Sequence, residues 1–161
     1  MSYIDRVLQP GETVAHSSRL HWVVYVPGWA ILAFGAAGLI LLPHRAAQGI
    51  YLYASLTVAG VGLLTLLVAW IKRVTTEIAV TSRRFIFKEG FISRRTMEMN
   101  LDKIESIDVN QSVLQRLLGY GTVVVRGTGS GLEPLKRVDA PINLRNGVMA
   151  VASAAPPRAT G

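Results

Sequence analysis

The fold of this chain is decided by WVVYVPGWAILAFGAAGLILL (Trp22–Leu42) and IYLYASLTVAGVGLLTLLVAWI (Ile50–Ile71), two long apolar blocks. The first has 21 residues and the second 22, and neither contains a charge. A helix of about 20 apolar residues crosses the hydrocarbon layer of a bilayer, which is roughly 30 Å thick. Only Pro43–Gly49 separates the blocks. We therefore predict a transmembrane helical hairpin over residues 22–71, with helices at 22–42 and 50–71.

The alternative is a pair of buried helices in a soluble all-helical core. Such helices run about 10 to 14 residues and carry a polar face, whereas neither block has a polar stripe. A cleaved signal peptide fits poorly, because its apolar core is shorter than the first block. Neither block contains an ionisable side chain of the kind that ion pathways use, so we expect an anchor rather than a transporter. Aromatic residues gather near the block ends, as they do at membrane interfaces: Trp22, Tyr25, Trp29, Tyr51, Tyr53 and Trp70.

The charge is distributed unevenly along the chain. Residues 72–161 hold 14 of the 17 Lys and Arg and 8 of the 10 Asp and Glu, a net charge of +6. Arg45 alone lies between the helices, while basic residues flank the hairpin on the side of both termini. The positive-inside rule therefore predicts a multi-pass protein with both termini in the cytoplasm. There is no cysteine, which excludes disulfides, thiolate metal sites and cysteine nucleophiles.

Outside the hairpin, we expect a polar cytoplasmic lead over residues 1–21, one small domain over 72–155 and a disordered tail over 156–161. In the domain the periodicity changes to the alternation typical of strands. We predict an antiparallel meander that begins with four strands and is followed by two more after a short helix. The expected strands cover residues 76–80, 85–88, 91–101, 104–109, 121–126 and 135–138.

Two helices are expected in this domain. Ser112 and Gln115 have the spacing of a capping box, which predicts a helix over Val113–Leu118 that Gly119 ends. Near the C-terminus, Leu144, Val148 and Val151 recur at i, i+4 and i+7, with Asn143 as the expected N-cap. Asn146-Gly147 is a poor interior for that second helix.

Three motifs carry a resemblance to a known family. They are T-x-x-R-F-I-F-x-x-G-x-x-S-R-R-T from Thr81, LDKIESIDVNQS from Leu101 and L-Q-R-L-L-G-Y-G-T from Leu114. The chain resembles small bacterial membrane proteins with a bacterial pleckstrin-homology-like (PH-like) domain. The resemblance implies an α+β protein of the inner (plasma) membrane, in which the hairpin precedes a partly open antiparallel β-barrel or sandwich of about seven strands with a C-terminal capping helix. PH-like domains mostly bind phospholipids, peptides or their own copies.

The candidate binding residues are basic. Arg84 and Lys88 share a strand face, and the turn at Glu89-Gly90 brings the next basic pair near them. Three interpretations stay open: a solvated face, binding of anionic lipid headgroups, or binding of an acidic protein partner. The short run Arg83-Arg84 does not match the spaced basic signature of phosphoinositide binders. The full candidate set is Lys72, Arg73, Arg83, Arg84, Lys88, Arg94 and Arg95.

We expect no catalytic residue, no metal site and no cofactor. A Ser-His-Asp arrangement would require His16 or His21 to fold back on the domain, and GTGSG (Gly127–Gly131) lacks the features of a phosphate-binding loop. Nucleic-acid binding is not expected, because the basic residues have little aromatic interleaving. The sequence predicts a non-enzymatic, membrane-anchored binding or scaffold module that forms a homo-oligomer and contacts membrane lipids or a membrane-protein partner. The alternative is an accessory subunit of a larger membrane complex, such as a protease or transporter.

Overall fold

The computed structural model describes residues 3–41, 48–91, 95–128 and 134–154, and the predicted tail (156–161) lies outside them. The chain consists of two compact units. We call Trp22–Val74 the hairpin unit, and Met1–His21 with Thr75–Gly161 the sheet unit. The lead that the sequence analysis set apart therefore belongs to the same unit as the C-terminal domain.

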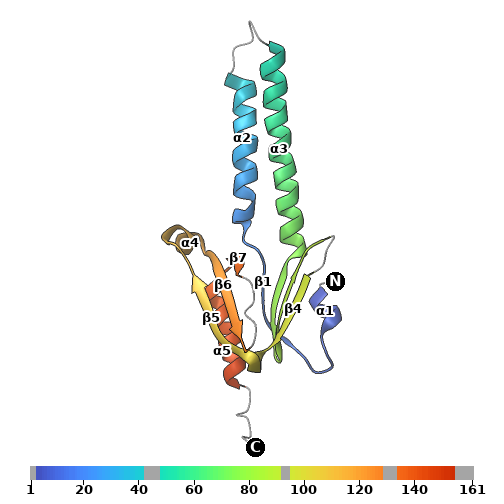
Figure 1. Cartoon of the computed structure of the whole chain (residues 1–161), viewed down its shortest axis with the longest axis vertical. Coiled ribbons are helices and arrows are strands. Elements are labelled where there is room, and N and C mark those ends of the chain that lie inside the picture. Colours follow the sequence, from blue (N-terminus) through green and yellow to red (C-terminus); the bar gives the residue numbers. More distant parts are fainter. Residues whose placement is uncertain (1–2, 42–47, 92–94, 129–133, 155–161) are drawn as a thin grey trace, which may run out of the picture. The chain divides into compact units, whose positions relative to one another are not determined.

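The hairpin unit consists of a 3₁₀ turn, η1 (Trp22–Tyr25), followed by α2 (Val26–Leu41) and α3 (Gln48–Thr75), which lie side by side (Figure 1). The candidate spans Trp22–Leu41 and Gly49–Thr75 have mean hydropathies of 1.9 and 2.1, and 17% of the 18-residue apolar window of each is buried. By length and composition, both are able to cross a membrane. α3 continues four residues past the predicted end at Ile71, because Lys72 and Arg73 end the apolar stretch without ending the helix.

Glycines let the two helices approach closely. A Cβ added at Gly35 would lie 2.6 Å from the backbone nitrogen of Ala59, and one added at Gly62 would lie 2.6 Å from that of Leu32. Small residues at helix contacts are the usual solution in a bilayer, where packing rather than water exclusion holds helices together. Gly35 and Gly62 therefore serve packing within the hairpin.

The sheet unit contains seven strands among its described residues. β1–β2–β3–β4 form one antiparallel sheet, and β5–β6–β7 form a second. The strands are β1 (Val14–Ser18), β2 (Glu77–Thr81), β3 (Arg84–Glu89), β4 (Arg95–Asn100), β5 (Ile104–Asn110), β6 (Tyr120–Gly127) and β7 (Leu135–Asp139). Strands at all six expected places are confirmed, although β4 covers only Arg95–Asn100 of the expected 91–101, of which 92–94 lie outside the described residues. β1 in the lead was not predicted.

The expected continuous meander is wrong, because β4 and β5 belong to different sheets. Between them the chain forms a 3₁₀ turn, η2 (Leu101–Lys103), in which Leu101 is buried against the core. Burying this side chain turns the chain away from the first sheet. The second sheet therefore starts at Ile104 with a new partner, β6.

The two sheets do not close into a barrel among the described residues. They meet where the lead leaves β1. The amide of Asp139 donates to the carbonyl of Arg19 at 3.0 Å, the amide of His21 donates to the carbonyl of Arg137 at 2.8 Å, and Leu20 forms an isolated bridge with Val138. The lead thus joins the first sheet to β7 of the second, and the result is a two-sheet sandwich rather than a closed barrel.

The core lies between the sheets and under α5 (Pro141–Ala154). Phe85, Leu144 and Val148 are at most 1% exposed, which confirms the predicted apolar side of the C-terminal helix. The helix begins at Pro141, two residues before the expected cap, because proline suits the first helical turn. The helix continues through Gly147, where a glycine is needed because an added Cβ would lie 3.0 Å from the Cβ of His16.

Two short helices complete the sheet unit. α1 (Tyr3–Val7) belongs to the lead, contacts β2 and buries Ile4. α4 (Val113–Leu118) joins β5 to β6 and has the predicted boundaries. Both hydrogen bonds of its capping box are present, and Gly119 ends it with a left-handed φ of 79°.

Candidate binding surface

Arg84 is part of an internal ion-pair cluster. Its Nε donates to Oε1 of Glu12 at 3.0 Å and its Nη2 donates to Oε2 at 2.9 Å, while Nη1 donates to Glu98 at 2.6 Å. The Glu12 side chain is fully buried and that of Arg84 is 12% exposed. Arg84 also donates to the carbonyl oxygen of Val7 at 2.8 Å. This arginine attaches the lead to the first sheet, so its charge is already neutralised within the fold.

The carboxylate of Glu12 is surrounded by donors. Besides the two from Arg84, it accepts from the Thr81 hydroxyl at 2.6 Å and from the amide of Gln9 at 2.9 Å. Hydrogen bonding to Arg84, together with these two donors, lowers the pKa of Glu12 to about 2, despite the opposing effect of burial. The same pairing raises the pKa of Arg84. The pair is therefore ionised across the physiological pH range.

Two other candidates, Lys88 and Arg95, face acidic residues across the sheet. Lys88 lies opposite Glu77 on β2, and Arg95 of β4 lies opposite Glu89 of β3. Opposite charges at directly paired positions stabilise antiparallel strands. The basic face predicted from the sequence is therefore a mixed face in which each of these cations has an acidic neighbour.

The remaining candidates are dispersed. Lys72 and Arg73 belong to the last turns of α3, where the Arg73 guanidinium lies 5.6 Å from the centre of the Tyr25 ring. Arg83 is exposed on the β2–β3 turn, at the opposite end of these strands from Lys88. Arg94 lies outside the described residues. Among the described candidates of the sheet unit, Arg83 and Arg84 lie at one end of β3, and Lys88 and Arg95 lie at the other.

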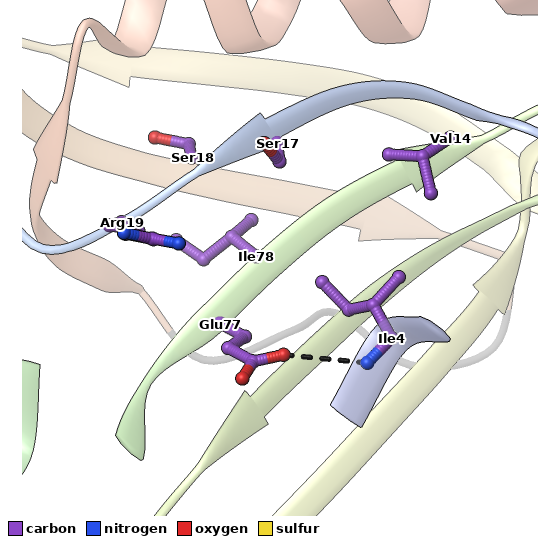
Figure 2. Close-up of a pocket in the computed structure, with 7 residues that line it drawn as sticks. All are labelled: Ile4, Val14, Ser17, Ser18, Arg19, Glu77 and Ile78. Atoms are coloured by element: carbon purple, nitrogen blue, oxygen red, sulfur yellow. Dashed lines mark hydrogen bonds between the residues drawn. The ribbon is translucent and has the colours of Figure 1, made fainter. Parts of the chain in front are cut away.

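A pocket of about 220 Å³ lies at the lead, and Figure 2 shows its lining residues. The amide of Ile4 donates to Glu77 at 3.4 Å beside it, which ties α1 to β2 (Figure 2). Small-molecule sites usually enclose about 300–1,000 Å³, so the pocket is too small for a typical ligand. Its lining residues are Ile4, Val14, Ser17, Ser18, Arg19, Glu77 and Ile78.

His21 does fold back on the domain, next to an aspartate and a serine. Its ring stacks on Tyr120 with centroids 5.1 Å apart, and its Nε2 lies 4.0 Å from Oδ1 of Asp139. The Ser18 hydroxyl donates to the backbone carbonyl of Asp139 at 2.8 Å. A catalytic triad requires the histidine to accept the serine proton and to donate to the aspartate. Here the serine proton is directed to a carbonyl oxygen, and 4.0 Å exceeds hydrogen-bonding distance.

The described residues contain no group of three or more His, Asp or Glu side chains that would hold a metal ion. They do contain exposed apolar residues outside the hairpin unit, which the sequence analysis did not single out. α4 exposes Val113 and Leu117 by 85% and 81%, and Phe91 is 69% exposed. The signal was present in VLQRLL, whose apolar residues recur at i, i+1, i+4 and i+5 along a helix that the capping box had already located.

These features define a small α+β domain of two antiparallel sheets and a C-terminal helix, joined to two long apolar helices. A family model described as bacterial PH domain matches residues 24–152. Since the match covers most of the chain, the protein belongs to the bacterial PH domain family, which confirms the resemblance. A comparison with curated proteins gave no match. A domain of this family fits a binding or scaffold module, and the two apolar helices support membrane association.

Proposed function

We propose that the protein is a membrane-anchored, non-enzymatic binding or scaffold module at the cytoplasmic face of the bacterial inner membrane. The main observation in support of this proposal is that the region matched by the bacterial PH domain family includes two helices whose apolar side chains are mostly exposed. Exposed apolar side chains along two whole helices are costly in water and favourable in lipid. The Ser18 hydroxyl donates to a backbone carbonyl and not to a histidine, which argues against a catalytic triad at this position.

The proposed ligands are anionic lipid headgroups or a protein partner, together with further copies of the chain. Lys72, Arg73, Lys88 and Arg95 are the basic residues proposed for lipid, because they lie at or near the point where α3 continues into β2. Arg83 is better placed for a protein partner, at the far end of β2. Self-association is supported by the edge strands β4 and β5, whose outer hydrogen-bonding groups can pair with another copy.

The proposal is tested by extracting membranes that contain the full-length protein with alkaline carbonate, and then purifying it in a mild detergent. We expect the protein to stay with the membrane and to elute as a homo-oligomer. Release by carbonate would refute the anchor. Co-purification of a second membrane protein at a fixed ratio would support the accessory-subunit alternative, and a turnover abolished by one polar substitution would refute the non-enzymatic role.

A further inference from the structure

The sheet unit exposes an apolar surface on α4. Val113 is 85% exposed, Leu117 81%, Leu114 69% and Leu118 42%. At helical spacing these four side chains share one side of α4, and Gln115 and Arg116 occupy the other. An exposed apolar patch with a polar rim usually marks a surface that contacts a partner or a membrane.

A second exposed apolar side chain lies on the other sheet. Phe91 is 69% exposed and follows Gly90, whose φ of 96° is one that glycine adopts readily. We call Phe91 and the four apolar residues of α4 together the apolar foot. Its two parts come from connections in different sheets, β3–β4 and β5–β6.

Both parts lie at the end of the sheet unit from which the chain continues into the hairpin. α4 is followed directly by Gly119 and Tyr120, and the Tyr120 ring stacks on His21, the last residue before Trp22. Phe91 lies three residues beyond Lys88, which pairs with Glu77 near the start of β2. Figure 1 shows α4 at the tip of the β5–β6 hairpin. Each part of the foot is therefore within a few residues of a connection to an apolar helix.

We infer that the apolar foot inserts into the headgroup and acyl boundary of the bilayer that holds the hairpin. The inference rests on the proposed membrane anchor. An amphipathic segment of this kind lies in the interface with its apolar side buried by about 5–10 Å. The tether keeps this surface near the bilayer at all times, which gives lipid an advantage in effective concentration over any diffusing partner.

Charge supports a lipid surface with anionic headgroups. Residues 111–121 carry a single charged side chain, Arg116, which is exposed. Lys72 and Arg73 lie just before Thr75, where the chain enters the sheet unit again. Segments that bind anionic membrane surfaces usually combine basic residues with apolar residues that enter the membrane.

The absence of cysteine makes a site-specific test possible in the full-length protein. The variants Leu117→Cys and Phe91→Cys, each carrying an environment-sensitive fluorophore, are reconstituted in phosphatidylcholine vesicles containing phosphatidylglycerol. Thr128→Cys is the matched control, because this exposed position lies at the other end of β6, roughly 25 Å away at about 3.3 Å per strand residue. Spin-labelled lipid should quench the fluorophore several-fold more at positions 117 and 91 than at 128, and aqueous iodide should show the reverse order.

Leu114→Cys repeats the test where a label at Leu117 disturbs α4. Equal quenching by iodide at 117, 114 and 128 would overturn the inference, and so would shielding from both quenchers, which would indicate a protein contact. Carbonate extraction of the same variants separates the two proposals. Retained protein with a water-exposed foot refutes only the insertion, whereas released protein refutes the anchor as well.

Discussion

Arg84 holds Glu12 through two parallel hydrogen bonds, from Nε to Oε1 at 3.0 Å and from Nη2 to Oε2 at 2.9 Å, across 72 positions of the sequence. This bidentate geometry is specific to a guanidinium. It fixes the lead on β3 and thereby places β1 at the edge of the first sheet. The arginine that the sequence suggested as a lipid contact therefore organises the fold.

Replacing this arginine should destabilise the sheet unit. Arg84→Gln leaves the buried Glu12 carboxylate without its main partner, and breaking a buried pair in this way costs about 3–5 kcal/mol. Arg84→Lys should cause an intermediate loss of stability, since lysine keeps the positive charge but cannot donate two parallel hydrogen bonds. The measurement is hydrogen exchange of β1 and β3 peptides in the full-length protein. Arg83→Gln is the control, because that neighbouring side chain is exposed and its loss should change stability by about 0.5 kcal/mol or less; equal effects at both positions would contradict the assignment.

The same pair predicts a pH dependence. The pKa of Glu12 falls from 4.5 to about 2 on folding, so the folded state favours the carboxylate. The stabilisation is fully present above pH 4.5 and is lost as the pH falls toward 2. Calorimetry of the wild type and of Glu12→Gln should therefore give melting temperatures that differ clearly at pH 6 and converge at low pH. A difference that stays constant with pH would show that Glu12 acts through its shape and not its charge.

Packing in the hairpin unit gives a prediction with a matched control two residues away. Gly62→Val places a side chain against the backbone of Leu32, which cannot move aside cheaply, and overpacking costs about 1–3 kcal/mol. Gly60→Val meets nothing within 4 Å and should be tolerated. The chain's tryptophans, Trp22, Trp29 and Trp70, all belong to the hairpin unit, so their fluorescence during thermal unfolding in detergent reports this packing directly. Equal melting curves for the two variants would show that the helices do not pack through Gly62.

Local signals explain what the sequence made predictable. The boundaries of α4 follow from the pair Ser112 and Gln115, whose reciprocal bonds involve only neighbouring residues. β2 follows from the alternation of Ile78 and Val80, and β3 from that of Phe85 and Phe87; all four side chains belong to the core. In each case the information lies within a few positions of the element that it specifies.

The missed features depend on partners far along the chain. β1 has the sequence VAHSS, which lacks the apolar alternation of a strand. It forms because β2 pairs with it and α5 packs against it. Gly147 is tolerated in α5 because His16, 131 positions earlier, occupies the space of its missing side chain. The role of Glu12 was hidden for the same reason, since no local pattern links it to Arg84. Lys88 and Arg95 could be predicted to meet at the β3–β4 connection, whereas Arg84 lies at the other end of β3 with Glu12 and Glu98, which no local pattern indicates.

The orientation of the hairpin is the last prediction. A link of seven residues between two long apolar helices forces them to be antiparallel if they span the bilayer, so the two ends of the chain share one side. That side carries the basic residues, including Lys72 and Arg73 in the last turns of α3, while the link carries only Arg45. Short loops rich in Lys and Arg stay in the cytoplasm.

A reporter fused at Gly161 should therefore be active in the cytoplasm, and one inserted at Gln48 should be active only outside the inner membrane. The variant Lys72→Gln with Arg73→Gln removes two charges next to the second span and should increase the fraction of inverted molecules, because these positions lie within the range that the positive-inside bias samples. Lys136→Gln with Arg145→Gln removes the same charge at exposed positions far beyond that range and should leave the orientation unchanged. Activity of both reporters in one compartment would mean that the two helices do not form a membrane-spanning hairpin.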